Sequence, residues 1–327
     1  MQDKKIVAIG GGTGLFTLLS GLKEYTENIT AIVTTADNGG SSGILRDELG
    51  FLPVGDIRRC IIALSESREL MYELFNYRFE KGSLAGHSVG NLLIAAMLSI
   101  NNGDFLKTLK QFSSILAIRG RVLPATLQNV TLYARLEDGS IVKGEAAIGG
   151  YHKYSHEIDV EKLTERAKIS NVFINPRAKA LPEALAAIKK ADMIILGPGS
   201  LYTSIISNFL VDGVAKAIKE SKAKKIFVCN IMTQIGETED YSASQHLGAI
   251  EEYLGKGIIN IMLLNTGAAK KETLERYKTE YKELVIPDVK NIPQNIKVIK
   301  KNLIKGNILV RHDPKKLAKA IMAIINK

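Results

Sequence analysis

Four glycines and a threonine stand together near the start of the chain, as Gly10-Gly11-Gly12-Thr13-Gly14. They follow a short apolar run and precede leucines at helical spacing, which predicts a turn from a buried strand into a helix. Such a turn leaves backbone N–H groups bare at a helix N-terminus, where the helix dipole favours phosphate. Glycine also removes the Cβ atoms that would keep a diphosphate away from the backbone. A plain tight turn rarely needs so many glycines. We therefore predict a phosphate site at this turn; the alternative is a tight strand-to-helix turn that needs glycine only for its dihedral angles.

This glycine turn matches neither of the two common nucleotide-binding motifs. No Lys-Ser/Thr pair follows it at the spacing of a P-loop. In the dinucleotide fingerprint, the position of the third glycine is held by Leu15 or Thr17, depending on where counting starts. A second predicted strand, 29–35, ends at Asp37, about 20 residues beyond the turn, where an acid can bind a ribose hydroxyl. The pattern favours a nucleotide more than it favours NAD.

The segment 36–43 is dense in glycine, serine and acidic or amide side chains. We expect it to be a mobile loop above the edge of the sheet, where binding elements commonly lie; the alternative is an ordinary surface loop. Its candidate ligand-binding residues are Asp37, Asn38, Ser41 and Ser42. Asp37 is also a candidate catalytic residue and a candidate ligand for a metal ion, and it is the only acid in this loop.

Two further segments of the first half carry candidate residues. Asp56 is predicted to N-cap a helix that contains Arg58 and Arg59, of which at least one should be free for an anion unless the pair is a solvated face. His87 precedes an apolar helix predicted for 89–100, as a candidate general acid or base or as a capping or core residue. Asn91 lies inside that apolar run and needs a buried partner, so it is a candidate ligand contact.

Polar residues follow strand after strand in the second half of the chain. A buried strand at 191–196 ends in Gly197-Pro198-Gly199-Ser200, a second glycine-rich turn, before a helix predicted for 205–210. The next predicted strands, 225–229 and 258–264, end at Asn230 and Asn265. Open parallel sheets bind ligands at this carboxyl edge. Arg311 follows a last predicted strand, 307–310, and is a candidate anion contact or a surface arginine.

These patterns predict an α/β fold: a Rossmann-like, mostly parallel sheet with helices on both faces. Between 121 and 148 the apolar pattern changes to a period of two. There Glu137-Asp138-Gly139-Ser140 predicts a hairpin turn, with 141–146 as the returning strand. We expect a single domain over residues 1–327 with a β insertion at about 121–148.

Composition limits the classes of function. The net charge of +10 suits an acidic partner, but the lysines are dispersed and no nucleic-acid-binding signature accompanies them. A phosphorylated small molecule accounts for a basic pocket equally well. With only Cys60 and Cys229, no signal peptide and no apolar run long enough to span a bilayer, we expect a cytoplasmic protein without membrane insertion. His152 and His156 would need a further ligand to form a metal site.

Five motifs in order resemble the gluconeogenesis factor (YvcK-type) family, within the superfamily of 2-phospho-L-lactate transferases (CofD-like). They are residues 10–14, 36–43, 86–91, 197–204 and 230–234. The resemblance implies a bound UDP-sugar, UDP-N-acetylglucosamine, and a cytoplasmic role in cell shape and wall synthesis during growth on gluconeogenic carbon sources. We also expect a homo-oligomer, a dimer.

The same resemblance assigns roles to residues of this chain. It places the diphosphate at Gly11, Gly12, Thr13 and Gly14 and, in the same region, at Gly199 and Ser200. It places Asn230 and Gln234 near the base or ribose. The transferase branch has two adjacent acids after its second strand, whereas the second position here is Asn38. That difference weakens metal-assisted transfer.

Three functions remain open from the sequence. The first is a regulatory protein that binds a nucleotide sugar, needs no cofactor for binding and has little or no catalysis. The second is a Mg²⁺-dependent transferase of a phosphoryl-linked group, in which Asp37 holds the metal and Arg58 or Arg59 clamps phosphate. The third is an NAD-dependent oxidoreductase. Retained glycine turns beside a lost acid favour the first.

Overall fold

The computed structural model describes residues 4–66, 69–150, 163–279, 282–305 and 310–325. Its centre is a seven-stranded sheet in which every neighbouring pair is parallel, in the order β10-β9-β8-β7-β1-β2-β3. The strands are β1 (Ile6–Gly10), β2 (Ile29–Val33), β3 (Arg121–Pro124), β7 (Met193–Leu196), β8 (Lys224–Val228), β9 (Ile261–Asn265) and β10 (Lys297–Lys301). This confirms the predicted Rossmann-like sheet.

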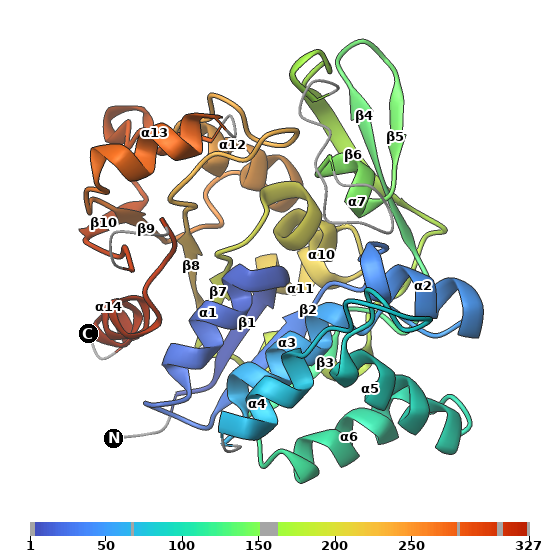
Figure 1. The fold of residues 1–327 in the computed structure, drawn as a ribbon. Helices are drawn as coiled ribbons and strands as arrows, with labels where there is room; N and C mark the ends of the chain where they lie inside the picture. Colours follow the sequence, from blue (N-terminus) through green and yellow to red (C-terminus); the bar gives the residue numbers. More distant parts are fainter. Residues whose placement is uncertain (1–3, 67–68, 151–162, 280–281, 306–309, 326–327) are drawn as a thin grey trace.

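Helices cover both faces of this sheet, so its central strands are buried on both sides (Figure 1). In β1, Ile6 and Ala8 pack into one core, and Val7 and Ile9 pack into the other. The first core is built with α1 (Gly12–Leu22), α3 (Gly55–Leu64), α4 (Glu69–Asn76), α5 (Val89–Ile100), α6 (Phe105–Ile115) and α14 (Pro314–Ile325). The second is built with α9 (Pro182–Lys190), the π-helix η1 (Leu201–Ile206), α10 (Ser207–Phe209), α11 (Val214–Glu220) and α12 (Ala243–Leu254).

A second, three-stranded antiparallel sheet lies beside the large one, at the upper right of Figure 1. Its strands are β5 (Ile141–Lys143), β4 (Thr131–Leu136) and β6 (Ile169–Asn175), in that order. The predicted hairpin of β4 and β5 is confirmed. Two other expectations for this part of the chain were wrong. Residues 121–124 form β3 of the large sheet, and β6, far along the chain, adds a third strand.

Other differences from prediction concern helices near the carboxyl edge of the sheet. The expected loop at 36–43 already contains the start of α2 (Gly40–Leu49), and Glu145, expected in a strand, begins α7 (Glu145–Ile148). The helix after β7 starts at Leu201 as the π-helix η1, four residues before the predicted 205. The remaining helices are α13 (Lys271–Thr279) and the 3-10 turn η2 (Val289–Asn291).

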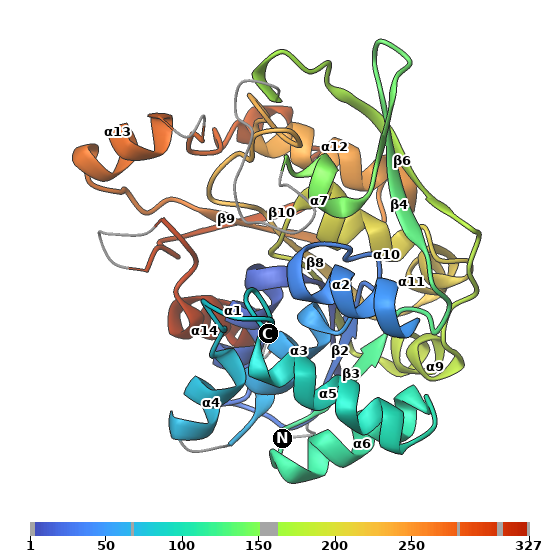
Figure 2. The ribbon, with the colours of Figure 1, turned by 45° about the vertical axis from the view of Figure 1, so that its right-hand side comes forward.

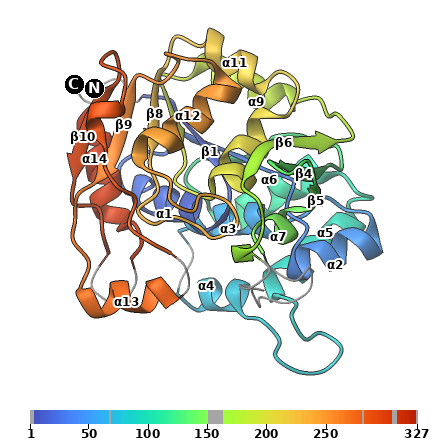
Figure 3. The same ribbon diagram turned by 90° about the horizontal axis from the view of Figure 1, so that it is seen from above.

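The strand order reverses between β1 and β7. From β1 the chain proceeds outward to β2 and β3, whereas β7, β8, β9 and β10 proceed outward in the other direction. In open parallel sheets, ligands bind outside the carboxyl ends of the strands at such a reversal. Seen from above in Figure 3, β1 and α1 lie near the middle of the molecule, between the β8–β10 half and the α2–α6 half. The fold therefore places both glycine turns at its reversal point.

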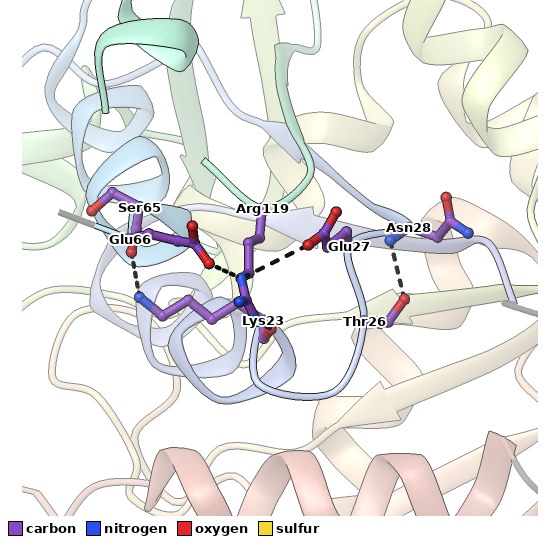
Figure 4. Close-up of polar contacts among 7 residues, drawn as sticks. All are labelled: Lys23, Thr26, Glu27, Asn28, Ser65, Glu66 and Arg119. Carbon is purple, nitrogen blue, oxygen red and sulfur yellow. Dashed lines mark hydrogen bonds and ion pairs between the residues drawn. The ribbon is translucent and has the colours of Figure 1, made fainter. Parts of the chain in front are cut away.

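At the amino ends of the strands, polar contacts tie α1 to α3 (Figure 4). Lys23, which follows α1, donates to the carbonyl of Ser65 at the end of α3 over 2.6 Å. Arg119, just before β3, pairs with Glu66 and with Glu27, the latter at 3.9 Å. These contacts hold together the far ends of two helices whose first residues lie at the carboxyl edge (Figure 2). Exposed ion pairs contribute little stability, so their effect is mainly on position.

Two segments with earlier expectations, 307–309 of the last predicted strand and the pair His152 and His156, lie outside the described residues. Among the helices that the structure describes, none combines the length and the apolar character needed to cross a membrane.

Candidate functional site

The two glycine turns contact each other directly at the carboxyl ends of β1 and β7. A Cβ atom on Gly14 would lie 2.2 Å from the carbonyl oxygen of Pro198, and a Cβ on Gly199 would lie 3.3 Å from that of Gly11. Gly12 has a φ of +62°, a conformation that residues with a side chain rarely adopt. Glycine is needed here for close approach of two backbones and for a left-handed turn.

Three α-helices begin at this point, α1, α2 and α3, and in none of them does the N-cap residue offer a side chain that caps the first turn. Their first residues, Gly12, Gly40 and Gly55, all line one cavity of about 470 Å³. Uncapped N-termini present free N–H groups and the positive ends of three helix dipoles. Such an arrangement favours an anionic ligand.

The cavity brings together most of the residues that the sequence predicted. Its volume lies in the usual range for small-molecule sites, about 300–1,000 Å³. The predicted residues on its wall are Gly11, Gly12, Thr13, Gly14, Asp37, Ser41, Ser42, Asn91, Gly199, Ser200 and Gln234, together with Arg58 and Arg59. Segments from both halves of the chain therefore form one site.

Two candidates of the first half are placed behind the cavity wall. Asn38 is buried, and its Oδ1 accepts a hydrogen bond from the backbone N–H of Ala146 over 3.0 Å, which fixes α7. His87 is buried with its Nδ1 3.1 Å from the hydroxyl oxygen of Ser41. Neither lines the cavity. In this structure both side chains position residues that do line it.

Two candidates of the second half line a smaller, adjoining cavity of about 210 Å³. Asn230 and Arg311 lie there, beside Thr13, Ser200 and Gln234, which belong to both cavities. The Oδ1 atom of Asn230 is buried and has no hydrogen-bond partner among the described residues. The two cavities together provide a continuous polar lining that runs across the two glycine turns.

Carboxylates that the sequence analysis missed face the same cavity as Asp37. Asp56, predicted as a helix cap, is not one, because α3 begins at Gly55 and Val54 precedes it. A Cβ on Gly11 would lie 2.5 Å from its Oδ2 atom. Glu145 reaches the cavity from the start of α7. Position 38 thus carries an amide in place of an acid, but two carboxyl groups from other elements, Asp56 and Glu145, line the cavity with Asp37.

Burial perturbs this group of acids. Loss of solvent and the nearby charge of Asp56 raise the pKa of Asp37 to about 6, although Asp37 accepts a 2.9 Å bond from the N–H of Gly39. Burial, and next the charge of Asp37, raise the pKa of Glu145 well above its usual value. Among the described residues, one ion pair involves this group of acids: Arg59 lies 3.6 Å from Asp56. The carboxyl groups repel one another, which favours a bound cation or proton between them.

A magnesium ion fits this donor set only with help from a ligand. No group of three or more His, Cys, Asp or Glu side chains within the described parts of the chain is arranged to hold a metal ion. Mg²⁺ commonly takes one or two carboxylates and completes its shell with substrate phosphates and water. Asp37 and Asp56, which line the cavity together with the first glycine turn, match that pattern.

Glu237, also missed from the sequence, organises the second glycine turn. Its Oε2 accepts the N–H groups of Tyr202 and Thr203 at the start of η1, over 3.0 and 3.3 Å. Its Oε1 accepts from the Gln234 amide, whose own oxygen accepts from Ser200 over 2.8 Å. Burial raises the pKa of Glu237. The network locks Ser200 and Gln234 in one orientation.

On another wall, Arg58 is buried in a polar network. Its Nε donates to Oδ1 of Asn91 over 2.8 Å, and its Nη1 donates to the carbonyl of Phe75 and to Oδ1 of Asn76. The amide of Asn91 in turn donates to Ser41. Arg78, which no sequence signal indicated, lines the same cavity.

Comparison with known proteins agrees with this arrangement. The family model described as "2-phospho-L-lactate transferase CofD" matches residues 6–304. The chain belongs to the CofD family. Several relatives are named gluconeogenesis factors or putative gluconeogenesis factors. One from Thermoanaerobacterium thermosulfurigenes, named as putative, is 47% identical over 99% of this chain and 98% of its own.

A second relative, the gluconeogenesis factor of Bacillus subtilis, is 41% identical over 100% of this chain and 99% of its own. The fold has also been solved in a relative: a crystal structure of a UPF0052 family protein from Bacillus halodurans has a TM-score of 0.89 and 43% identity. It covers 98% of this chain and 99% of that one. These matches confirm the family resemblance that the five motifs indicated, over nearly the whole chain.

Proposed function

We propose that this CofD-family protein binds a UDP-sugar, UDP-N-acetylglucosamine, and acts as a regulatory binding protein. The diphosphate would lie between the two glycine turns, against Gly11–Gly14 and Gly199-Ser200. The observation that supports this most is the convergence of three uncapped helix N-termini with two glycine turns in direct contact. A diphosphate carries the charge and the number of oxygen acceptors that such a cradle suits.

The uridine would extend into the smaller cavity. Asn230 and Gln234 offer amide donors and acceptors there, the groups that a pyrimidine edge or a ribose hydroxyl requires. Arg311 adds a positive charge on the same side. The sugar would then face the larger cavity, which Asp37, Ser41 and Ser42 line with oxygen atoms suited to sugar hydroxyls.

The biological role that we propose follows the names of the relatives. Proteins 41–47% identical to this chain are named gluconeogenesis factors. We propose the same role here, in the cytoplasm: supporting cell shape and wall synthesis on gluconeogenic carbon sources. A protein that senses a wall precursor by binding it could link carbon supply to wall synthesis without consuming the precursor.

Titration calorimetry with UDP-N-acetylglucosamine tests the binding proposal. Protein freed of nucleotide by unfolding and refolding is titrated with UDP-N-acetylglucosamine, with UDP and with N-acetylglucosamine alone. We expect saturable binding of the first two and none of the free sugar, because the diphosphate makes the main contacts. Equal, non-saturable heats for all three would contradict the proposal.

A second candidate function, a Mg²⁺-dependent transferase, gains support from a specific observation. Asp37, Asp56 and Glu145 face one cavity beside the phosphate cradle, so carboxylates are more numerous than the sequence indicated. Bound Mg²⁺ would stabilise charge on phosphate oxygens. An acceptor hydroxyl oxygen would bond to the donor's phosphorus, the phosphoanhydride bond would break, and a nucleoside monophosphate and a proton would be released.

Chromatography of the nucleotide after incubation with Mg²⁺ and candidate acceptors separates the two functions. A binding protein returns UDP-N-acetylglucosamine unchanged. Steady release of UMP that depends on the protein and on an acceptor, and that disappears in Asp37→Asn, would establish the transferase instead.

A further inference from the structure

The cavity contains two guanidinium groups that lack a carboxylate partner. Arg58, on α3, is 4% exposed, and its hydrogen bonds go to one backbone carbonyl and two side-chain amides. Arg78 is half-buried and donates to the backbone carbonyl of Gly86. Among the described residues, neither has an acidic group within ion-pair distance, whereas the adjacent Arg59 is paired with Asp56.

These arginines repel one another. Loss of solvent, and next the charges of Arg59 and Arg78, lower the pKa of Arg58 to about 10. Burial and the charge of Arg59 likewise lower the pKa of Arg78. Both side chains nevertheless stay protonated at neutral pH. A buried charge without a counter-charge is costly, so its presence in a cavity wall points to an anion supplied from outside the chain.

The pair stands on a different wall from the glycine turns. Asp56 lies against Gly11, but Arg58 turns away to Asn91 of α5 and to Phe75 of α4. Arg78 comes from the segment between α4 and α5. The carboxyl groups of Asp37 and Asp56 line the same cavity as the two arginines and the glycine turns.

We propose that Arg58 and Arg78 form a second anion subsite, which binds a phosphate or carboxylate group other than the diphosphate held by the glycine turns. This proposal rests on the proposed function for the assignment of the first anion. Paired guanidinium groups bind planar carboxylates and tetrahedral phosphates through several charge-assisted hydrogen bonds. Ser41 and Asn91, fixed beside Arg58, would add neutral donors.

The chemistry of the nucleotide limits the source of this anion. The sugar of UDP-N-acetylglucosamine has no charged group. The second anion therefore belongs either to a separate phosphorylated or carboxylated small molecule, or to a sugar that carries a carboxylate in the same nucleotide. In both cases the bound state contains one anionic group more than UDP-N-acetylglucosamine supplies.

Titration calorimetry with inorganic phosphate, in the absence and in the presence of saturating UDP-N-acetylglucosamine, tests the subsite. We expect phosphate to bind in both conditions, because the nucleotide fills only the glycine turns. Arg78→Gln should weaken phosphate binding in the presence of nucleotide about tenfold, the loss that one charge-assisted bond implies. Arg58→Gln should do the same, but its guanidinium also bonds to α4, so Arg78→Gln is the deciding variant.

Arg177→Gln serves as the matched control, because Arg177 is 86% exposed and pairs with Asp212 outside the cavity. Its phosphate affinity should equal that of the unaltered protein. If nucleotide saturation abolishes phosphate binding, or if Arg78→Gln binds phosphate as the control does, the subsite does not exist. If UDP-N-acetylglucosamine does not bind at all, the proposed function fails, and phosphate titration of Arg78→Gln against the control still decides the subsite.

A second ligand distinguishes the two sources. UDP-glucuronate places a carboxylate on the sugar. If it binds more tightly than UDP-N-acetylglucosamine in the unaltered protein and loses that advantage in Arg78→Gln, the second anion is part of the nucleotide. If the two nucleotides bind alike while phosphate binds in addition, the anion is a separate molecule. Both results support the subsite.

Discussion

Single residues in the two glycine turns serve different physical needs. Gly12 is required for its positive φ, since an added Cβ would meet only the Ser204 hydroxyl at an ordinary 3.6 Å. Gly14 has no such backbone angle and is required because Pro198 is so close. A run of glycines in a sequence therefore predicts a special turn, but it does not show which glycine is needed for a positive φ and which for close approach of another backbone.

Gly12→Val should abolish nucleotide binding while the protein stays folded. A β-branched side chain at this φ strains the turn by about 1–3 kcal/mol and displaces the N–H groups of the proposed diphosphate site. Calorimetry with UDP-N-acetylglucosamine measures the first effect, and circular dichroism checks the fold. Gly139→Val is the matched control: Gly139 also has a positive φ, +86°, but stands in the β4–β5 turn with open space around it. It should lose stability and keep its affinity.

The sequence could not predict which side chains point into the cavity. Asp37, Ser41 and Ser42 were grouped from the sequence as one candidate binding element, and in the structure all three line the same cavity. Asn38 lies between Asp37 and Ser41 in the chain, but its side chain bonds to the backbone of Ala146 in α7. Asp56 looked like a cap, and nothing in its local sequence indicates that Gly11 brings the first turn against it.

Elements with strong apolar periodicity were predicted well. The helix 89–100 has the predicted bounds, and a capping serine lies at its start. The short helices at the cavity were not predicted: α2 begins with glycine and serines, and α7 has only four residues. Such elements are stabilised by tertiary contacts, here by Asn38 and by the β sheet, and carry little signal of their own.

The substitution Gly14→Ala tests the contact between the two glycine turns. The methyl group would overlap the Pro198 carbonyl and must move α1 away from the second turn, so we expect a loss of about 1–3 kcal/mol of stability together with weaker nucleotide binding. Gly248→Ala in α12 is the control. A Cβ there meets nothing within 4 Å, and alanine should stabilise the helix by about 0.5–1 kcal/mol. Urea unfolding measures both; equal effects of the two substitutions would refute the contact.

At the scale of the whole molecule, a buried histidine should make stability depend on pH. His312 is buried, mainly loss of solvent lowers its pKa to about 4, and its Nε2 has no partner among the described residues. The unfolded chain takes up a proton near pH 6.5, whereas the folded protein does not until about pH 4. Stability from this group is therefore complete above pH 6.5 and is lost as the pH falls toward 4.

His312→Gln should remove that part of the pH dependence. Between pH 7 and pH 4.5 the unaltered protein should lose about 2 kcal/mol more of its unfolding free energy than the variant does. Urea unfolding at the two pH values gives the difference directly. Parallel losses in both proteins would show that His312 is already charged in the folded state.

The reversal of strand order between β1 and β7 brings the two glycine turns to one point, although Gly14 and Gly199 are 185 residues apart in the chain. The sequence predicted both turns and a parallel sheet, but only the strand order shows that the turns are neighbours. A crystal structure of the protein soaked with UDP-N-acetylglucosamine tests the consequence most directly. The account predicts diphosphate density between Gly11–Gly14 and Gly199-Ser200, within hydrogen-bond distance of the backbone N–H groups of α1. Nucleotide density elsewhere on the molecule, with these turns unoccupied at saturating nucleotide, would contradict it.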